Sequence, residues 1–246
     1  MSKRVLVTGA SGFVGANLVH RLVEDGHETH LLLRPPHQTW RLRDLGGHAG
    51  QHHAHIENAA AVKAIIHSVK PEWVFHLAAC GENPQQTDMQ EMVSTNLMGT
   101  VHLLDACLSE GVEAFVQAGT IQESDPTGPY GITKAAASRY CEWVARTKGV
   151  QAVVVRMPKL FGPWEDPLRP VPSAVVRALR TNTELVAPAG NRSYVENGVE
   201  SLLAAAGSGV LPEEVPFDTG IQKFTAWLLE HPEILRMYET RLELKA

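Results

Sequence analysis

The stretch that decides the fold is RVLVTGASGFVGANLVHRLVEDGH, residues 4–27. It begins with a β-branched run and continues into a segment whose apolar residues recur at helical spacing. Between the two lie Gly9, Gly12 and Gly15. Glycines at this point let the backbone turn tightly and let a pyrophosphate approach the N-terminus of the helix. The stretch therefore predicts a strand, a nucleotide-binding loop and a helix. The alternative is a tight turn that holds no ligand.

Strand-like and helix-like segments alternate along the first two-thirds of the chain. Further strands are expected at 28–34, 73–79, 113–119 and 151–157, and further helices at 58–69, 92–111 and from 129 onward. Such alternation predicts an α/β fold, with a doubly wound parallel sheet that helices cover on both faces. Past Gly162 the sequence is first proline-rich and then helical in pieces, which indicates a small second lobe.

Composition limits the class of partner. The chain has 246 residues, of which 44% are hydrophobic, and its net charge of −5 argues against nucleic acid or an anionic membrane as a partner. Its first residues are typical of a buried strand and not of a signal peptide, and no apolar run approaches the ~18 residues of a membrane span. Cys80, Cys107 and Cys141 are odd in number and widely spaced, which favours reduced thiols in a cytoplasmic protein.

A second informative stretch is GPYGITKAAASRY, residues 128–140. Its alanines favour helix, and Tyr130 and Lys134 are one helical turn apart, so their side chains point the same way. An ammonium beside a phenol favours the phenolate, and such a phenol can exchange a proton at neutral pH. The pair is therefore a candidate acid/base site. The alternative is an exposed helix N-terminus.

Six collinear stretches together resemble the extended short-chain dehydrogenase/reductases, the NAD-dependent epimerase/dehydratase family. They are TGASGFVG (8–15), VFHLAA (74–79), NLMGTVHLLDAC (96–107), FVQAGT (115–120), PYGITK (129–134) and VVRMPKLFGPWED (154–166). The resemblance implies a Rossmann-type NAD(P)-binding domain over residues 1–160. It also implies a small, reduced substrate-binding lobe over residues 161–246, interleaved with the sheet.

In the resembled family the catalytic roles are known residue by residue. The resemblance implies that Tyr130 gives a proton to a sugar oxygen, or takes one from it, as hydride moves at the nicotinamide ring. Lys134 would hold the nicotinamide ribose and lower the tyrosine pKa, and the Thr120 hydroxyl would bind the reacting carbonyl. Asn96 would support the region around the tyrosine.

The resemblance also implies two sets of ligand contacts. Cofactor contacts are expected from Gly9, Ser11, Gly12, Phe13, Val14, Gly15, Arg34, Leu77, Ala78, Ala79, Asn96, Tyr130, Lys134, Pro158 and Leu160. Substrate contacts are expected from Cys80, Gly81, Thr120, Ile121, Lys159 and Arg169. No metal is expected, because the loop that carries His48, His52, His53 and His55 does not offer ligands in fixed geometry.

The end of the second predicted strand bears on the choice of cofactor. An acidic residue there would hold the ribose hydroxyls of NAD, but this chain has Leu33 followed by Arg34. A guanidinium suits a 2′-phosphate, so NADP(H) is expected to be preferred and NAD(H) stays possible. The alternative is that Arg34 is a solvated charge at the strand end.

Departures from the family pattern narrow the reaction. Dehydratases of the family follow the threonine with Asp-Glu, and 3,5-epimerase/reductases place a cysteine two residues after it, whereas this chain has Ile121 and Gln122. The expected function is therefore NADP(H)-dependent reduction of the keto group of a nucleotide-activated 4-keto-6-deoxyhexose in deoxysugar biosynthesis. Alternatives are an NAD-dependent C4 epimerase of a nucleotide sugar or a reductase of a non-nucleotide ketone.

Other departures keep a different class of function open. His55 stands where relatives have an aspartate that contacts adenine, Lys159 where they have a substrate-binding asparagine, and Glu196-Asn197 where they have an acidic pair. These changes favour a catalytically silent nucleotide-binding protein as the alternative. Helices of the family at 92–108 and 131–145 form a four-helix interface, so a homodimer is expected.

Overall fold

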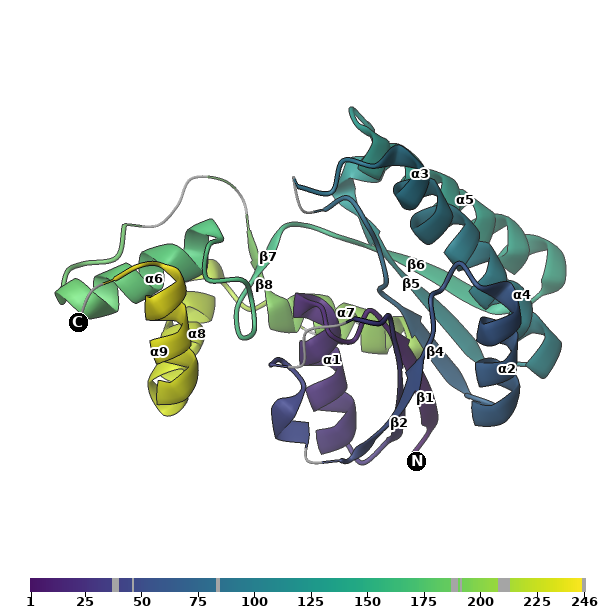
Figure 1. Cartoon of the computed structure of the whole chain (residues 1–246), viewed down its shortest axis with the longest axis horizontal. Helices are drawn as coiled ribbons and strands as arrows, with labels where there is room; N and C mark the ends of the chain where they lie inside the picture. The colour runs from purple at the N-terminus through teal and green to yellow at the C-terminus, as the bar shows by residue number, and fades with distance from the viewer. Residues whose placement is uncertain are drawn as a thin grey trace.

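The computed structural model centres on a parallel sheet of six strands in the order β3-β2-β1-β4-β5-β6 (Figure 1). It describes residues 1–36, 40–45, 47–82, 85–186, 190, 192–207 and 213–244. The strands are β1 (Arg4–Thr8), β2 (Glu28–Leu33), β3 (Ala49–His53), β4 (Trp73–His76), β5 (Ala114–Thr120) and β6 (Gln151–Met157). The chain winds outward from β1 in both directions, so the doubly wound α/β fold predicted from the sequence is confirmed.

Helices cover both faces of this sheet, as the alternating pattern predicted. One face carries α2 (Ala59–Val69), α4 (Gly99–Glu110) and α5 (Pro129–Lys148), and the other carries α1 (Phe13–Glu24) and α7 (Val195–Ala206) (Figure 1). The sheet therefore divides the hydrophobic core into two layers. Fully buried side chains such as Leu103 fill the first layer, and others such as Leu18 and Leu202 fill the second.

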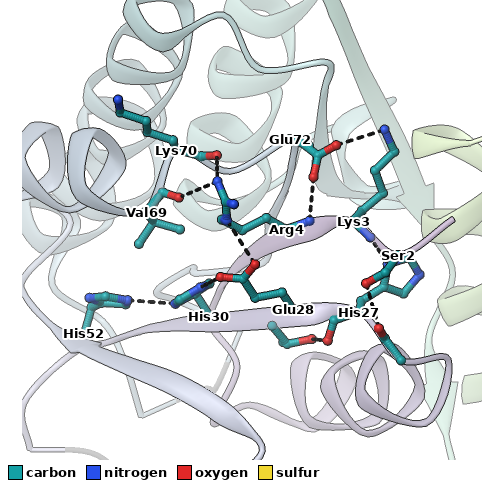
Figure 2. A network of polar contacts seen from close by, with 12 residues as sticks. Ser2, Lys3, Arg4, His27, Glu28, His30, His52, Val69, Lys70 and Glu72 are labelled. Atoms are coloured by element: carbon teal, nitrogen blue, oxygen red, sulfur yellow. Dashed lines mark hydrogen bonds and ion pairs between the residues drawn. The ribbon is translucent and has the colours of Figure 1, made fainter.

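The edge strand β3 is a correction to the sequence analysis, which expected a histidine-containing loop there. Gly50 leaves room for the His30 ring of β2, because a Cβ at this position would lie 2.5 Å from Nδ1 of His30. Nδ1 of His30 lies 3.1 Å from Nε2 of His52 across the two strands, within hydrogen-bond distance. Nε2 of His30 is hydrogen-bonded to the Glu28 carboxylate (Figure 2). This strand is polar because it lies at the edge of the sheet, and a polar sequence carries no period-2 signal.

The helical segment before β5 is also more divided than predicted. Instead of one helix from residue 92, a short helix α3 (Met89–Met92) leads into a π-helical segment, η2 (Val93–Met98), and then into α4. A π-helical turn is rare and often lies at a functional site. Here it contains Asn96, whose side chain is buried beneath the carboxyl end of the sheet.

The C-terminal third of the chain forms a small separate sheet with its own helices and also adds one helix to the large sheet. A second, two-stranded sheet pairs β7 (Leu160–Phe161) with β8 (Ser193–Tyr194), next to α6 (Pro170–Thr181), α8 (Phe217–Glu230) and α9 (Pro232–Arg241). Between them the chain returns to the large sheet as α7, which packs against α1 and β6 (Figure 1). The division into domains at residue 160 stays a prediction.

Two short turns complete the described elements. They are the 3₁₀ turns η1 (Arg43–Leu45) and η3 (Ile121–Glu123). Within the described ranges, none of the helices has the length and apolar character that crossing a membrane requires. All three cysteines are buried and free.

The glycine loop generates a prediction about stability. A Cβ at Gly15 would lie 2.2 Å from the carbonyl oxygen of Gly9, which is backbone and cannot swing away. We therefore expect Gly15→Ala to lower the free energy of unfolding by about 2 kcal/mol or more, although alanine favours helix. Urea denaturation followed by circular dichroism measures this change.

Gly128→Ala is the matched control for this variant. A Cβ at Gly128 meets nothing within 4 Å, and the residue caps α5 without a side chain. We expect a loss of about 1 kcal/mol at most, the usual effect of alanine at a helix N-cap. Equal losses in the two variants would contradict the steric explanation.

Candidate functional site

The site lies at the carboxyl edge of the parallel strands, beside β1 and β4. These neighbouring strands are where the strand order reverses, because β2 and β3 follow β1 on one side and β5 and β6 follow β4 on the other. Ligands of open α/β sheets bind outside this edge, at the point where the strand order reverses. Three of the expected segments begin there: the glycine loop follows β1, Leu77–Gly81 follows β4, and Thr120 ends β5. The edge is therefore where the expected cofactor and catalytic residues come together.

The glycine loop is shaped by close backbone contacts. Gly9 has a φ of 70°, and a Cβ there would lie 2.6 Å from the amide nitrogen of Ala78. Gly12 begins α1 without a side-chain hydrogen bond to the first turn. The first amide groups of α1 therefore have no side-chain cap. Such a cradle suits a pyrophosphate, so the loop and its neighbours Ser11, Phe13 and Val14 fit a dinucleotide.

Arg41 connects this loop to the C-terminal lobe, and the sequence analysis missed it. Its Nη1 donates to the carbonyl oxygen of Ser11 at 3.2 Å, and its Nε donates to that of Trp164 at 2.6 Å. Trp164 has a φ of 67°, unusual for a bulky residue, and its indole stacks on His20. Burial lowers the pKa of Arg41. No periodic pattern surrounds Arg41, so the sequence offered no signal for this role.

A buried chain of hydrogen bonds joins β1, β4 and α4. The Thr100 hydroxyl donates to the carbonyl oxygen of Asn96 at 2.7 Å, so its oxygen is left to accept from Nε2 of His76 at 2.9 Å. Nδ1 of His76 then accepts from the Thr8 hydroxyl at 2.7 Å, and the Thr8 oxygen accepts the amide of Ala78 at 3.2 Å. Burial and the nearby charge of Lys134 lower the pKa of His76 to about 3, so its ring is neutral.

Asn96 extends this chain to α5. Its Oδ1 accepts the amide of Cys80 at 2.7 Å, and its Nδ2 donates to the Cys80 carbonyl at 2.8 Å and to the Thr133 hydroxyl at 2.9 Å. Thr133 lies between Tyr130 and Lys134, so Asn96 joins the segment after β4 to the first turns of the tyrosine helix. Both N–H groups and the carbonyl oxygen of this side chain are hydrogen-bonded within the protein. Asn96 is therefore placed to support α5 and not to face an open cleft.

Tyr130 and Lys134 lie on the first two turns of α5, as predicted. The buried Lys134 donates from Nζ to the carbonyl oxygen of Ala118 on β5 at 2.6 Å, and burial lowers the pKa of its ammonium to about 8. The expected lowering of the Tyr130 pKa is not found. Burial and the charges of Glu82 and Glu123 raise this pKa above its ordinary value, because they disfavour the phenolate, while the Lys134 ammonium is held by Ala118.

Thr120 is oriented by a capping box that the sequence analysis did not identify. The backbone amide of Thr120 donates to Oε1 of the buried Glu123 at 2.8 Å, and the Thr120 oxygen accepts the amide of Gln122 at 3.3 Å. Glu123 is paired with Arg156 of β6 at 2.9 Å. The signal was present as a threonine followed three residues later by a glutamate. The box fixes Thr120, and the charge of Glu123 favours the charged form of Lys134.

The expected substrate residues differ in their exposure and in their partners. Ile121 and Lys159 are exposed, and Arg169 forms an ion pair with Glu82, which spans from the segment after β4 to the start of α6. Cys80, in contrast, is buried, and burial raises the pKa of its thiol, which argues against a reactive thiolate. Its neighbour Gly81 donates its amide to the side chain of Gln86 at 3.0 Å.

The remaining expected cofactor residues lie in the segments that follow β2 and β6. Arg34 directly follows β2, and its Nη1 lies 2.9 Å from the Glu91 carboxylate. Pro158 is exposed and Leu160 is buried in β7. In the same lobe Glu165 is buried, and within the described ranges its Oε2 has no hydrogen-bond partner. Burial raises the pKa of Glu165 to about 8, so it is mainly protonated at neutral pH.

The family model for the NAD dependent epimerase/dehydratase family matches residues 5–206. The chain belongs to this family. Among curated relatives, the low-salt glycan biosynthesis protein Agl12 of Haloferax volcanii is 25% identical over 240 residues, which cover 89% of this chain and 77% of the relative. A UDP-glucose 4-epimerase of Mycolicibacterium smegmatis is 26% identical over 257 residues, with 90% and 79% covered.

Solved structures agree with this assignment. A UDP-glucose 4-epimerase of Thermotoga maritima, solved with UDP-glucose, has a TM-score of 0.70 and 28% identity, with 82% of this chain and 72% of that chain covered. The WbmF enzyme of Bordetella bronchiseptica, solved with NAD⁺, has a TM-score of 0.78 over 98% of this chain and 97% of its own. Its identity is 18%, so it supports the fold alone.

The buried histidine of the family segment HLAA generates a prediction about pH. The folded pKa of His76 is about 3, below its ordinary value of 6.5, so between these values the unfolded chain binds a proton that the folded chain does not. The contribution of His76 to stability is therefore fully present above pH 6.5 and is lost as the pH falls toward 3. Between pH 6.5 and 4.5 the free energy of unfolding that is lost through His76 is about 2–3 kcal/mol.

The variant His76→Gln isolates this contribution, because glutamine can hydrogen-bond but does not titrate. We expect the free energy of unfolding of the variant to fall less steeply from pH 6.5 to 4.5 than that of the wild type. Urea denaturation at several pH values measures both slopes. Parallel slopes would mean that His76 is not the buried neutral base described above.

Proposed function

We propose that this chain is an NAD(P)-dependent enzyme that transfers hydride at one carbon of a nucleotide-activated sugar, with Tyr130 as the proton carrier. One observation supports this most strongly: the Lys134 ammonium bonds the Ala118 carbonyl and fastens the first turns of α5 to β5. This contact joins α5, one turn after Tyr130, to β5, whose last residue is Thr120 at the edge of the sheet that also carries the glycine loop. A binding protein has no need of a proton donor in that position.

The residues of the chain have distinct tasks in this proposal. The glycine loop and the N-terminus of α1 bind the pyrophosphate, and the backbone of Ala78 and Ala79 lies along the dinucleotide. The bound cofactor supplies or accepts the hydride. Thr120 and Tyr130 hydrogen-bond the reacting oxygen. Tyr130 is protonated at neutral pH, since burial raises its pKa, and so it is prepared to donate a proton to that oxygen.

Lys134 supports the proton transfer electrostatically. Its pKa near 8 keeps most of it charged at pH 7, although it is buried, and Glu123 favours the charged form. When a dinucleotide is bound, the ribose hydroxyls offer the ammonium further partners besides Ala118. A cation one helical turn from Tyr130 stabilises the phenolate that forms after the proton has left.

Net reduction is the first candidate reaction. Thr120 is followed by Ile121 and Gln122, which offer no acid and base for 4,6-dehydration. Arg34 stands directly after β2, where a guanidinium suits a 2′-phosphate, and NADPH is the usual donor for net reduction. On these grounds the substrate is the 4-keto group of a nucleotide-activated 4-keto-6-deoxyhexose, in deoxysugar biosynthesis. Arg169 and Lys159 of the C-terminal lobe offer positive charge to its diphosphate.

Epimerisation at C4 is the second candidate, and a specific observation favours it. The guanidinium of Arg34 is paired with Glu91 and is not free for a phosphate. Relatives named as UDP-glucose 4-epimerases support a reaction in which the hydride is returned to the substrate. A panel of nucleotide-linked hexoses and 4-keto-6-deoxyhexoses, each tested with NADPH and with NAD⁺, distinguishes the two reactions by net consumption of the cofactor.

The catalytic role of Tyr130 gives a direct prediction. We expect Tyr130→Phe to reduce turnover on the order of 10²–10⁴-fold, because it removes only the proton carrier. The dissociation constant for the dinucleotide should change by less than about threefold. Steady-state rates with the substrate that the panel identifies, together with a fluorescence titration of the cofactor, measure both quantities.

Tyr140→Phe is the matched control, since it removes a phenol on the same helix. The Tyr140 hydroxyl donates to Asp105 at 2.6 Å, well along α5 from Tyr130. This variant should retain its turnover. Full turnover by Tyr130→Phe would overturn the assignment of Tyr130 as the proton carrier. A wild-type protein that binds the dinucleotide but turns over no member of the panel would favour the silent nucleotide-binding alternative.

We further propose that the chain forms a homodimer in the cytoplasm through the helical face that contains α5. Large apolar side chains are exposed on this face, at 39–58% of their full surface: Met89, Val93, Met98, Ile132 and Trp143. Ile132 and Trp143 are three helical turns apart on α5 and so point the same way. An exposed apolar face of this kind favours contact with a second copy. The three buried, free cysteines support a reducing compartment.

Trp143→Glu should convert the dimer to a monomer at micromolar concentration, because the carboxylate would be buried against the second copy. Size-exclusion chromatography with light scattering measures the mass. Leu229→Glu is the control, since Leu229 is 59% exposed on α8, outside the proposed interface. A wild-type protein that is monomeric at all concentrations would contradict the proposal.

A further inference from the structure

The ion pair between Arg34 and Glu91 joins two segments that are far apart in the sequence. Nη1 of Arg34, just after β2, lies 2.9 Å from Oε1 of Glu91 in α3, and the two side chains are 49% and 43% exposed. An ion pair with this exposure contributes little to stability, on the order of 0–1 kcal/mol. The pair does, however, change the charge that a ligand meets when it approaches Arg34.

Glu91 has two partners, which follow two different strands of the sheet. On one side it pairs with Arg34, after β2. On the other side it hydrogen-bonds Cys80, after β4, and this bond contributes to raising the pKa of the Cys80 thiol. In the sheet, β1 lies between β2 and β4, and β1 leads into the glycine loop. The two partners of Glu91 therefore follow the strands on either side of β1, at the edge where the adenosine half of a dinucleotide would lie.

The position of Glu91 is fixed by local structure. The Asp88 side chain caps α3 and accepts the amides of Gln90 and Glu91 at 2.8 and 3.2 Å. The following π-helical segment is anchored by the buried Asn96, which holds Cys80 through two hydrogen bonds. Glu91 thus projects from a braced turn, and its carboxylate is directed toward Arg34.

The residue at the end of β2 normally distinguishes NAD from NADP, and this chain has no acid there. An acid accepts a hydrogen bond from the ribose 2′-hydroxyl, whereas an arginine binds a 2′-phosphate. Glu91 supplies from α3 the carboxylate that β2 lacks. It also neutralises Arg34 and repels a phosphate dianion that approaches the guanidinium.

We propose that Glu91 determines cofactor selectivity in this chain: its carboxylate accepts the ribose 2′-hydroxyl of NAD(H) and opposes the 2′-phosphate of NADP(H). The inference rests on the proposed function only in that it requires the glycine loop to bind a dinucleotide. Arg34 and Glu91 then act against each other. Arg34 alone would favour NADP(H), and Glu91 reduces that preference.

Equilibrium binding tests this proposal without any substrate. The dissociation constants for NADPH and NADH are measured by fluorescence titration for the wild type, Glu91→Gln, Arg34→Ala and the double variant. We expect Glu91→Gln to shift the ratio of the two constants toward NADPH roughly tenfold, because a tenfold change requires only about 1.4 kcal/mol. Arg34→Ala should shift the ratio toward NADH, and raised salt should reduce both shifts.

Glu110→Gln is the matched control, because it removes one negative charge at the C-terminal end of α4, where Glu110 pairs with His67. It should leave the ratio unchanged. A wild-type protein that binds both cofactors, combined with an unchanged ratio in Glu91→Gln or an equal shift in Glu110→Gln, would overturn the role of Glu91 and leave the proposed function intact. Failure of the wild type to bind either cofactor would overturn the proposed function, and this inference with it.

Discussion

The neutral ring of His76 is the interaction on which the rest of the site depends. It lies between two threonine hydroxyls, and the resulting chain of hydrogen bonds runs from the amide of Ala78 to the carbonyl of Asn96. Every donor on this route has an acceptor, which is the condition under which a buried polar network stabilises a fold. Asn96 then bonds Thr133, so one network sets the end of β4 against both β1 and α5. The cofactor edge and the tyrosine helix are positioned together.

The same region also contains a buried cation at a cost in free energy. Burial lowers the pKa of Lys134 to about 8, so folding disfavours its charge, and the Ala118 carbonyl and Glu123 offset part of that effect. A structural role alone would be met better by an apolar side chain. Shifted pKa values of this kind gather at functional sites, and those of Lys134 and Tyr130 lie on adjacent turns of one helix. The catalytic reading of the pair rests on this combination.

The sequence predicted the parts of the fold that rest on periodic patterns. The alternation of strands and helices, the glycine loop and the tyrosine helix were all visible, because each depends on local spacing. The edge strand β3 was not, since its residues are polar and its partner β2 supplies its order. The partners of Arg34 and Arg169 could not be predicted either. Glu91 and Glu82 lie 57 and 87 residues away from them, and only the fold brings each pair together.

The carboxylates of these two ion pairs come from the same part of the chain. Arg34 and Arg169 are two of the cations expected to meet phosphate groups, and each is paired with a carboxylate from the segment that follows β4. An anionic ligand must therefore replace one anion with another at each arginine, and the net gain in affinity is smaller than that of a free guanidinium. Exchange of this kind contributes more to discrimination between ligands than to affinity. In these proposals the segment after β4, which carries no glycine fingerprint and no catalytic motif, therefore takes part in the choice of ligand.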